Sequence, residues 1–177
     1  MSDRAPRGHL FLVGFMGAGK STVADRLAEA LGEPCVDLDD RVVETAGKPI
    51  AAIFADDGED AFRDLESLVL QSLAGEPPSV VACGGGIVLR PENRALLKEL
   101  GSVIYLEVTA GEALARIGDA KTRPLLAGSS GALAATSLLS AREALYRSVA
   151  DLTVDTVGRT PTEITQQILD DIEGFTA

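Results

Sequence analysis

Residues 14–21 form the motif with the clearest chemistry in the chain. They read Gly-Phe-Met-Gly-Ala-Gly-Lys-Ser and match the pattern G-x-x-x-x-G-K-S/T of a phosphate-binding loop. In such a loop, glycines let the backbone turn several N–H groups toward phosphate oxygens, the lysine contacts the β- and γ-phosphates, and the hydroxyl residue ligates Mg²⁺. The motif predicts a nucleotide-phosphate site, and the alternative is a glycine-rich turn that binds nothing.

The sequence on either side of this motif favours the phosphate site. Residues 10–13 are apolar and short enough for a buried strand, and residues 22–31 carry their apolar side chains at helical spacing. A helix that begins at the loop would add the positive end of its dipole to the site. The residues expected to bind the phosphates are Gly17, Ala18, Gly19, Lys20, Ser21 and Thr22.

Two carboxylates follow the next short apolar run. Asp37 and Asp39 come after residues 35–36, and residues two apart in an extended stretch point to the same side. One carboxylate could hold Mg²⁺ through water while the other accepts a hydrogen bond from a substrate hydroxyl. The alternative is that Asp39 only caps a helix through residues 42–43. The single histidine, His9, precedes the first strand, so a histidine general base is not expected.

Two more segments have residue types suited to a binding site. Arg63 and Glu66 lie three residues apart in a predicted helix, where they form either a surface ion pair or an arginine held ready for a substrate carboxylate. Residues 84–86 are three successive glycines, which permit close approach of the backbone to a ligand or simply make a tight turn. Cys83, just before them, is expected to be a buried small hydrophobe.

The elements that must position these residues alternate along the chain. Expected strands are residues 10–13, 35–36, 80–83, 103–106 and 152–154, and expected helices are residues 22–31, 50–54, 61–73, 92–100, 111–117, 133–149 and 161–172. This alternation predicts a parallel sheet with helices on both faces, and such sheets bind ligands beyond the carboxyl ends of their strands. Residues 160–163, Thr-Pro-Thr-Glu, predict a capping box at the last helix.

One stretch differs in composition from the rest of the chain. Residues 127–137 contain no charged side chain, and they follow Arg-Pro-Leu-Leu at residues 123–126. Small residues with two glycines are typical of a mobile lid, and the alternative is an ordinary solvent-exposed loop.

Composition limits the class of protein. The 177 residues, 46% of them hydrophobic, predict one globular domain over residues 1–177. No apolar run approaches the ~20 residues of a membrane span, residues 1–9 lack the apolar stretch of a signal peptide, and the two cysteines have no C-x-x-C spacing. We therefore expect a cytoplasmic protein with no membrane partner. The net charge of −11 argues against nucleic acid as a partner.

Taken in order, the motifs resemble those of the shikimate kinase family. The set consists of residues 14–21, 37–39, 58–66, 84–86, 123–126 and 145–147, the last reading Leu-Tyr-Arg. Each motif alone is unspecific, but the ordered set is specific and spans nearly the whole chain. One departure is Ala144, where many relatives have proline.

The resemblance implies a fold and an activity. The activity is ATP-dependent phosphorylation of the 3-hydroxyl of shikimate, giving shikimate 3-phosphate and ADP in the pathway to chorismate and the aromatic amino acids, with Mg²⁺ as cofactor. The fold is that of a P-loop NTPase of the nucleoside-monophosphate-kinase type, a three-layer α/β/α monomer with a five-stranded parallel sheet and a lid over about residues 118–137.

The resemblance also implies roles for individual residues. Lys20, Asp39 and Arg123 would be catalytic, with Arg123 meeting the transferring phosphate. Asp37 would join Ser21 at Mg²⁺. Arg116, Arg159 and Pro161 would complete the ATP site beside the adenine, with Arg123 also contacting ATP. The residues expected to bind shikimate are Asp39, Arg63, Gly84, Gly85, Gly86 and Arg147.

Two other classes of protein remain as alternatives: a P-loop kinase for another small molecule, and a nucleotide-dependent switch or regulatory binding module. A P-loop kinase for another small molecule, such as gluconate, would also bind a carboxylate. A nucleotide-dependent switch of the GTPase kind would be expected to carry Asn-Lys-x-Asp, which the sequence lacks. An inactive ATP-binding relative would be expected to have lost Lys20, Asp39 or Arg123, and all three are present.

Overall fold

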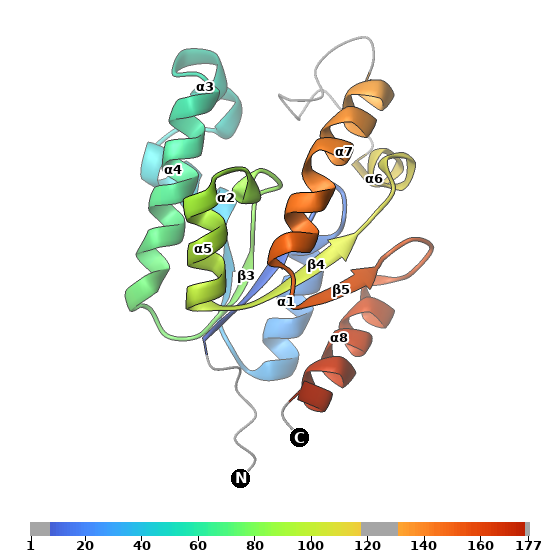
Figure 1. Cartoon of the computed structure of the whole chain (residues 1–177). Helices are drawn as coiled ribbons and strands as arrows, with labels where there is room; N and C mark the ends of the chain where they lie inside the picture. Colours follow the sequence, from blue (N-terminus) through green and yellow to red (C-terminus); the bar gives the residue numbers. More distant parts are fainter. Residues whose placement is uncertain (1–7, 118–130, 176–177) are drawn as a thin grey trace.

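A parallel sheet lies at the centre of the molecule (Figure 1). The structure is a computed structural model that describes residues 8–117 and 131–175, with side chains as far as Ile172. Within these residues the sheet has five strands in the order β2-β3-β1-β4-β5. They are β1 (His9–Val13), β2 (Cys35–Asp37), β3 (Val80–Ala82), β4 (Gly101–Glu107) and β5 (Leu152–Asp155). The predicted five-stranded parallel sheet is confirmed.

The central strand is buried on both faces, as an apolar run of this length predicts. All five residues of β1 are buried, and Phe11 lies in register with Val81 of β3 and Val103 of β4. Because all the strands are parallel, their carboxyl ends meet at one edge of the sheet. The predicted phosphate loop, the aspartates and the glycines all lie at or directly after the ends of strands at that edge.

Helices cover both faces of the sheet and give three layers (Figure 1). The helices are α1 (Lys20–Leu31), α2 (Leu38–Ala46), α3 (Ile50–Asp56), α4 (Glu59–Ser72), α5 (Pro91–Leu100), α6 (Ala110–Ile117), α7 (Gly131–Val149) and α8 (Pro161–Phe175), with short 3₁₀ turns η1 (Leu73–Gly75) and η2 (Ile87–Leu89). Helices α1 and α8 pack together on one face, whereas α4, α5 and α7 line the other. Among the described helices, none has the length and apolar character needed to cross a membrane.

The last helix begins as its sequence predicts. The Thr160 N–H donates to Glu163 Oε2 at 2.8 Å, and the Glu163 N–H donates to Thr160 Oγ1 at 3.3 Å. This reciprocal pair is the capping box, with Pro161 at the first helical position. The bonds to Thr160 hold the pKa of Glu163 below its ordinary value.

The predicted lid is only partly described. Residues 131–137 form the first turns of α7, so an irregular solvent loop does not describe them, while their part in a mobile lid stays a prediction. Alanine and leucine, which are strong helix formers, supply four of the seven residues 131–137. The remainder of the predicted lid, residues 118–130, lies outside the described residues.

Candidate active site

The predicted phosphate-binding loop joins β1 to α1. Gly17 has a φ of 78°, and a Cβ at this position would lie 2.5 Å from the Ala113 carbonyl oxygen, so both the backbone and the neighbouring helix require glycine. The Ala18 N–H donates to the Phe15 carbonyl at 3.1 Å and closes the turn. Helix α1 begins at Lys20, which directs its amino-terminal N–H groups at the loop.

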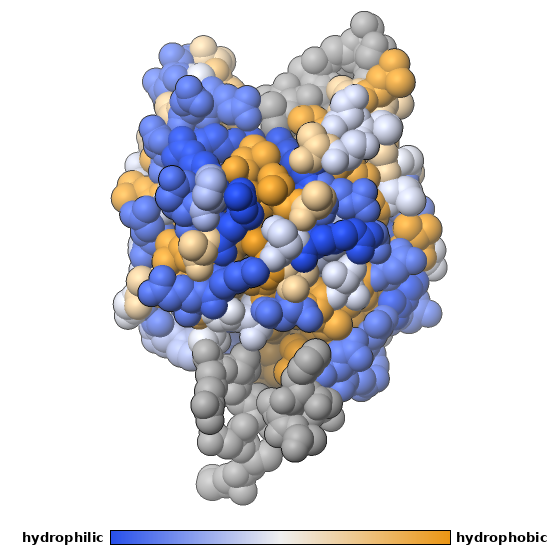
Figure 2. Space-filling view, viewed as in Figure 1, coloured by the Kyte–Doolittle hydropathy of each residue, from blue (hydrophilic) through white to orange (hydrophobic). Residues whose placement is uncertain are grey.

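A cleft of about 170 Å³ lies over this loop. The residues that line it are Met16, Gly17, Gly19, Lys20, Ser21, Thr22, Asp37, Asp39, Cys83, Gly84 and Gly85. Three predicted motifs therefore meet in one cleft. Figure 2 shows a hollow at the upper edge of the molecule, beside α3. Cys83 is buried, as the sequence predicts for a small hydrophobic residue. Burial raises the pKa of its thiol.

Lys20 lies folded over the loop. Its Nζ donates to the carbonyl oxygens of Gly14 and Phe15, each at 2.9 Å. These two acceptors hold a positive charge against the loop whose N–H groups would bind phosphate. The arrangement suits an anion with several negative oxygens.

Ser21 and Asp37 are in direct contact. Ser21 Oγ donates to Asp37 Oδ2 at 2.8 Å, while Asp37 Oδ1 accepts from the backbone N–H of Asp39 at 2.9 Å. The second bond makes Asp37 the N-cap of α2, which fixes the direction of its carboxylate. A hydroxyl and a fixed carboxylate side by side are the hard oxygen ligands that Mg²⁺ takes in kinase sites.

The geometry predicted for Asp39 is wrong, although its place in the cleft is as expected. Asp39 is not in an extended stretch, because α2 begins at Leu38, directly after Asp37. Nor does Asp39 cap the helix, since Asp37 does so. Asp39 lies in the first helical turn, and this turn directs it into the cleft that Asp37 also lines.

Arg63 and Glu66 form a buried pair, so a surface ion pair is excluded. Arg63 is 7% exposed and Glu66 is 2% exposed, and Arg63 Nη1 donates to Glu66 Oε2 at 2.5 Å. Arg63 Nη2 also donates to Glu59 Oε1 at 3.1 Å. Burial raises the pKa of Glu66, and the Arg63 charge opposes that rise. Within the described structure, Arg63 Nε and Glu66 Oε1 are buried without a hydrogen-bond partner, a costly state that a bound polar ligand would relieve.

Two of the three glycines, Gly84 and Gly86, pack closely against this pair. A Cβ on Gly86 would collide with the Arg63 guanidinium. A Cβ on Gly84 would lie 2.7 Å from Glu66 Oε1 and 2.8 Å from Asp39 Oδ1. The glycines therefore serve a close approach of backbone to charged side chains, which goes beyond a plain turn.

The structure places Arg147 away from the cleft, contrary to the role predicted for it. Arg147 forms ion pairs with Glu107 and Glu143, and its guanidinium lies over the Tyr105 ring at 5.8 Å. Its side chain is 48% exposed. These contacts describe a residue on the outer side of α7.

The arginine that α7 directs at the glycines is Arg142, which the sequence analysis missed. Arg142 is buried, and its Nη1 lies 3.7 Å from the Cβ position of Gly85. Residues five apart on a helix are about 140° apart around its axis, so Arg142 and Arg147 face different sides. The sequence does contain a signal for Arg142. Arg142, Tyr146 and Val149 recur at helical spacing and share the buried face of α7, and Arg147 does not lie on that face.

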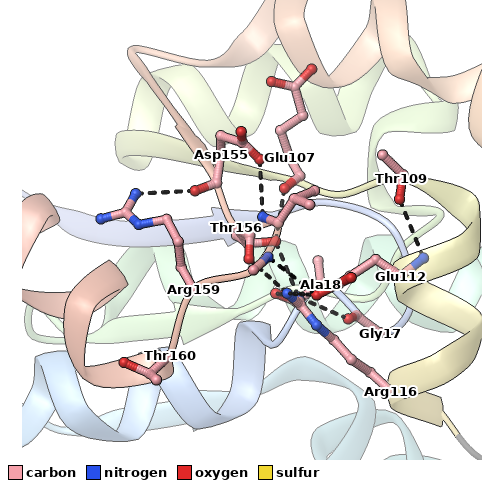
Figure 3. Close-up of polar contacts among 12 residues, drawn as sticks. Gly17, Ala18, Glu107, Thr109, Glu112, Arg116, Asp155, Thr156, Arg159 and Thr160 are labelled. Carbon is pink, nitrogen blue, oxygen red and sulfur yellow. Dashed lines mark hydrogen bonds and ion pairs between the residues drawn. The ribbon is translucent and has the colours of Figure 1, made fainter.

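The two arginines predicted beside the adenine approach the same segment (Figure 3). Arg116 donates to the Thr156 carbonyl at 2.7 Å, to Glu112 Oε1 at 2.9 Å and to the carbonyls of Gly17 and Ala18 at 3.4 Å. It thereby links α6 to the phosphate loop and to the turn after β5.

Arg159 lies on the other side of that turn. It donates to the Asp155 carbonyl at 3.1 Å and to the Glu163 carbonyl at 3.2 Å, next to Pro161 at the beginning of α8. Arg123, predicted to contact the transferring phosphate, lies outside the described residues.

The fold and the cleft define a P-loop phosphotransferase with a charged pocket beside its nucleotide loop. A model of the family described as shikimate kinase matches residues 16–173, and the chain belongs to this family. Its activity is therefore ATP-dependent phosphorylation of shikimate.

Individual relatives agree with the family assignment. The chain is 42% identical over 172 residues to shikimate kinase of Rhodopirellula baltica, with 95% of this chain and 92% of that protein covered. It is 44% identical over 158 residues to shikimate kinase of Rhodococcus jostii, covering 89% and 94%. The solved structure of shikimate kinase from Acinetobacter baumannii in complex with shikimate superposes with a TM-score of 0.91 at 38% identity, covering 94% of this chain and 93% of that one.

Proposed function

We propose that the cleft transfers the γ-phosphoryl group of ATP to the 3-hydroxyl of shikimate. The observation that carries this proposal is the joint lining of one cleft by the phosphate loop, by Asp39 and by Gly84 and Gly85. The acceptor oxygen forms a bond to the γ-phosphorus as the bond to the bridging oxygen breaks and ADP leaves. Such a transfer depends mainly on positioning and charge neutralisation.

ATP is held from two sides. Gly17, Ala18 and Gly19, together with the first residues of α1, including Thr22, surround the phosphates, and Lys20 turns from the loop carbonyls to the β- and γ-phosphates. Arg116, Arg159 and Pro161 border the adenine.

Ser21 and Asp37 would hold Mg²⁺, and the contact between their oxygens supports this assignment. When bound, the ion would screen negative charge on the phosphates of ATP. Arg123 contacts the transferring phosphate, a role that rests on the family resemblance alone.

Shikimate occupies the side of the cleft beside Arg63 and the three glycines. Arg63 and Arg142 bind its carboxylate, and their burial strengthens this interaction because little water screens the charges. Asp39 accepts the hydrogen bond of the 3-hydroxyl and takes its proton as the new bond forms. Gly84, Gly85 and Gly86 leave room for the ring of the acceptor.

We also propose that the enzyme acts as a monomer in the cytoplasm, with one domain over residues 1–177 and no nucleic-acid or membrane partner. The acidic balance of the chain, a net charge of −11, supports the part about nucleic acid, because phosphate backbones would be repelled.

A coupled assay of ADP release tests the function directly. The enzyme is given Mg·ATP with shikimate, with gluconate or with no acceptor, and Lys20→Met serves as the control that lacks the phosphate-binding amine. We expect turnover with shikimate only, and none from the control. Turnover with gluconate alone, or ATP binding without acceptor-dependent turnover, would contradict the proposal.

A further inference from the structure

Tyr146 is a buried side chain that reaches from α7 to the glycine loop. The residue is fully buried, and its Oη donates to the Gly85 carbonyl oxygen at 2.5 Å. Its ring stacks on Tyr105 of β4, with centroids 5.1 Å apart and planes inclined by 23°. The stack fixes the ring, and the hydroxyl at its end then fixes the carbonyl.

This hydrogen bond controls the direction of a whole peptide group. The peptide between Gly85 and Gly86 is planar and trans, as are all those in the described chain, so its N–H points opposite to its C=O. Tyr146 holds the carbonyl toward α7 and thereby directs the Gly86 N–H away from α7. Glycines impose little restraint of their own, so the loop depends on an external partner for its conformation.

The same helix face presents a charge to the loop. Arg142 precedes Tyr146 by four residues, about one helical turn, and its Nη1 lies 3.7 Å from the Cβ position of Gly85. Burial raises the pKa of Tyr146 to about 12, so the hydroxyl keeps its proton and remains a donor at neutral pH. Tyr146 thus lies directly behind the groups that would face an acceptor carboxylate.

We propose that Tyr146 is a positioning residue of the acceptor subsite. By holding the Gly85 carbonyl, it sets the glycine loop between Arg63 and Arg142, and so it determines the affinity for the carboxylate-bearing acceptor and leaves that for ATP unchanged. The inference rests on the proposed function, because it requires that the acceptor carboxylate lies at this loop.

Two hydroxyl deletions in one ring stack provide the test. Tyr146→Phe removes the hydroxyl that binds Gly85 and keeps the ring, and Tyr105→Phe removes the hydroxyl of the stacked partner as the matched control. We expect Tyr146→Phe to raise the KM and the Kd for shikimate about two- to tenfold, the effect of one net hydrogen bond. The KM for ATP should not change, and Tyr105→Phe should alter neither constant.

A further arm uses a ring analogue of shikimate that lacks the carboxylate. Its Kd should be the same for wild type and Tyr146→Phe, because the lost positioning concerns the carboxylate. Normal ATP binding by Tyr146→Phe reports in the same assay that the variant is folded.

Each other outcome overturns the inference in an identifiable way. Equal losses for ATP and shikimate, or the same loss from Tyr105→Phe, would mean that the hydroxyl supports only the fold. Wild-type constants in Tyr146→Phe would mean that the loop needs no such restraint. A wild-type enzyme that does not use shikimate would instead overturn the proposed function, and the inference with it.

Discussion

Two arginines in α7 show that burial and neighbouring charges decide how strongly a guanidinium can bind a ligand. Arg142 is 4% exposed and lies against the glycine loop, whereas Arg147 is exposed and paired with Glu107 and Glu143. A buried guanidinium is already desolvated before a carboxylate arrives, so its interaction with the ligand is strong. At an exposed guanidinium, the ligand carboxylate must compete with water and with the acidic neighbours of the arginine.

Replacing these two arginines in turn separates their roles. Arg142→Ala should raise the KM for shikimate by about 30-fold or more, equivalent to ~2 kcal/mol, because a buried charge partner is lost. Arg147→Ala should leave that KM close to the wild-type value. Steady-state kinetics with each substrate varied in turn measures both. A larger effect from Arg147→Ala than from Arg142→Ala would contradict the site described here.

The glycine loop predicts a second contrast. Gly86→Ala places a Cβ against the Arg63 guanidinium and should lower the free energy of unfolding by about 1–3 kcal/mol, as overpacking does. It should also raise the KM for shikimate, because Arg63 must move. Gly75→Ala is the matched control, since no heavy atom lies within 4 Å of its added Cβ. Denaturant unfolding and kinetics measure the pair, and equal behaviour of the two variants would contradict the close packing.

For single residues, the sequence predicts membership of a local motif better than it predicts whether a side chain is buried. The place of Lys20 over the phosphate loop could be predicted, because the loop is a local motif and Lys20 contacts the Gly14 carbonyl within it. The burial of Arg63 and Glu66 could not be predicted, because a spacing of three residues on a helix fits a surface pair equally well. Only the packing of the glycine loop over α4 distinguishes the two.

At the scale of elements, local signals determine where each element begins. The capping box predicts the beginning of α8, because Thr160 and Glu163 satisfy each other within one turn. A helix through residues 42–43 was expected only as an alternative, and its beginning at Leu38 was not predicted, since the chain passes from β2 to α2 without an intervening loop. Asp37 serves both, as the last residue of the strand and the cap of the helix, and no apolar periodicity reveals this double role.

The stack of Tyr105 from β4 on Tyr146 from α7 predicts a pH dependence of stability. Burial raises both pKa values from the ordinary 10 to about 12, so the folded protein binds more protons than the unfolded chain between these pH values. The stabilisation is therefore complete below pH 10 and is lost as the pH rises toward 12.

Absorbance of tyrosinate measures this directly, because the chain has two tyrosines and no tryptophan. In the folded protein the tyrosinate signal should develop about two pH units later than in denatured protein. Tyr105→Phe and Tyr146→Phe should each remove about half of the signal. Folded and denatured samples that titrate together would show that the rings are open to water.

At the scale of the whole molecule, one sheet organises every part of the site. The phosphate loop follows β1, Asp37 ends β2 and the glycines follow β3, so three adjacent strands supply the cleft from one edge. The alternation of strands and helices predicts this edge, since parallel strands must end together. The strand order itself arises from pairing between distant segments, and the sequence pattern alone leaves it open.

A single core predicts a single cooperative transition. Buried side chains from both helical layers and from all five strands form one continuous hydrophobic cluster in the described structure. Elements that share one core cannot unfold separately without exposing it, so loss of helix and loss of tyrosine packing should coincide. Far-ultraviolet circular dichroism reports the helices, and the near-ultraviolet signal reports the Tyr105–Tyr146 stack, without interference from tryptophan. Both probes should give the same midpoint and the same slope in denaturant. Leu27→Ala in the core should lower the free energy of unfolding by ~2–5 kcal/mol as measured by either probe, whereas Leu133→Ala at an exposed position should leave it unchanged. Separated transitions would show that the chain contains two units that unfold independently.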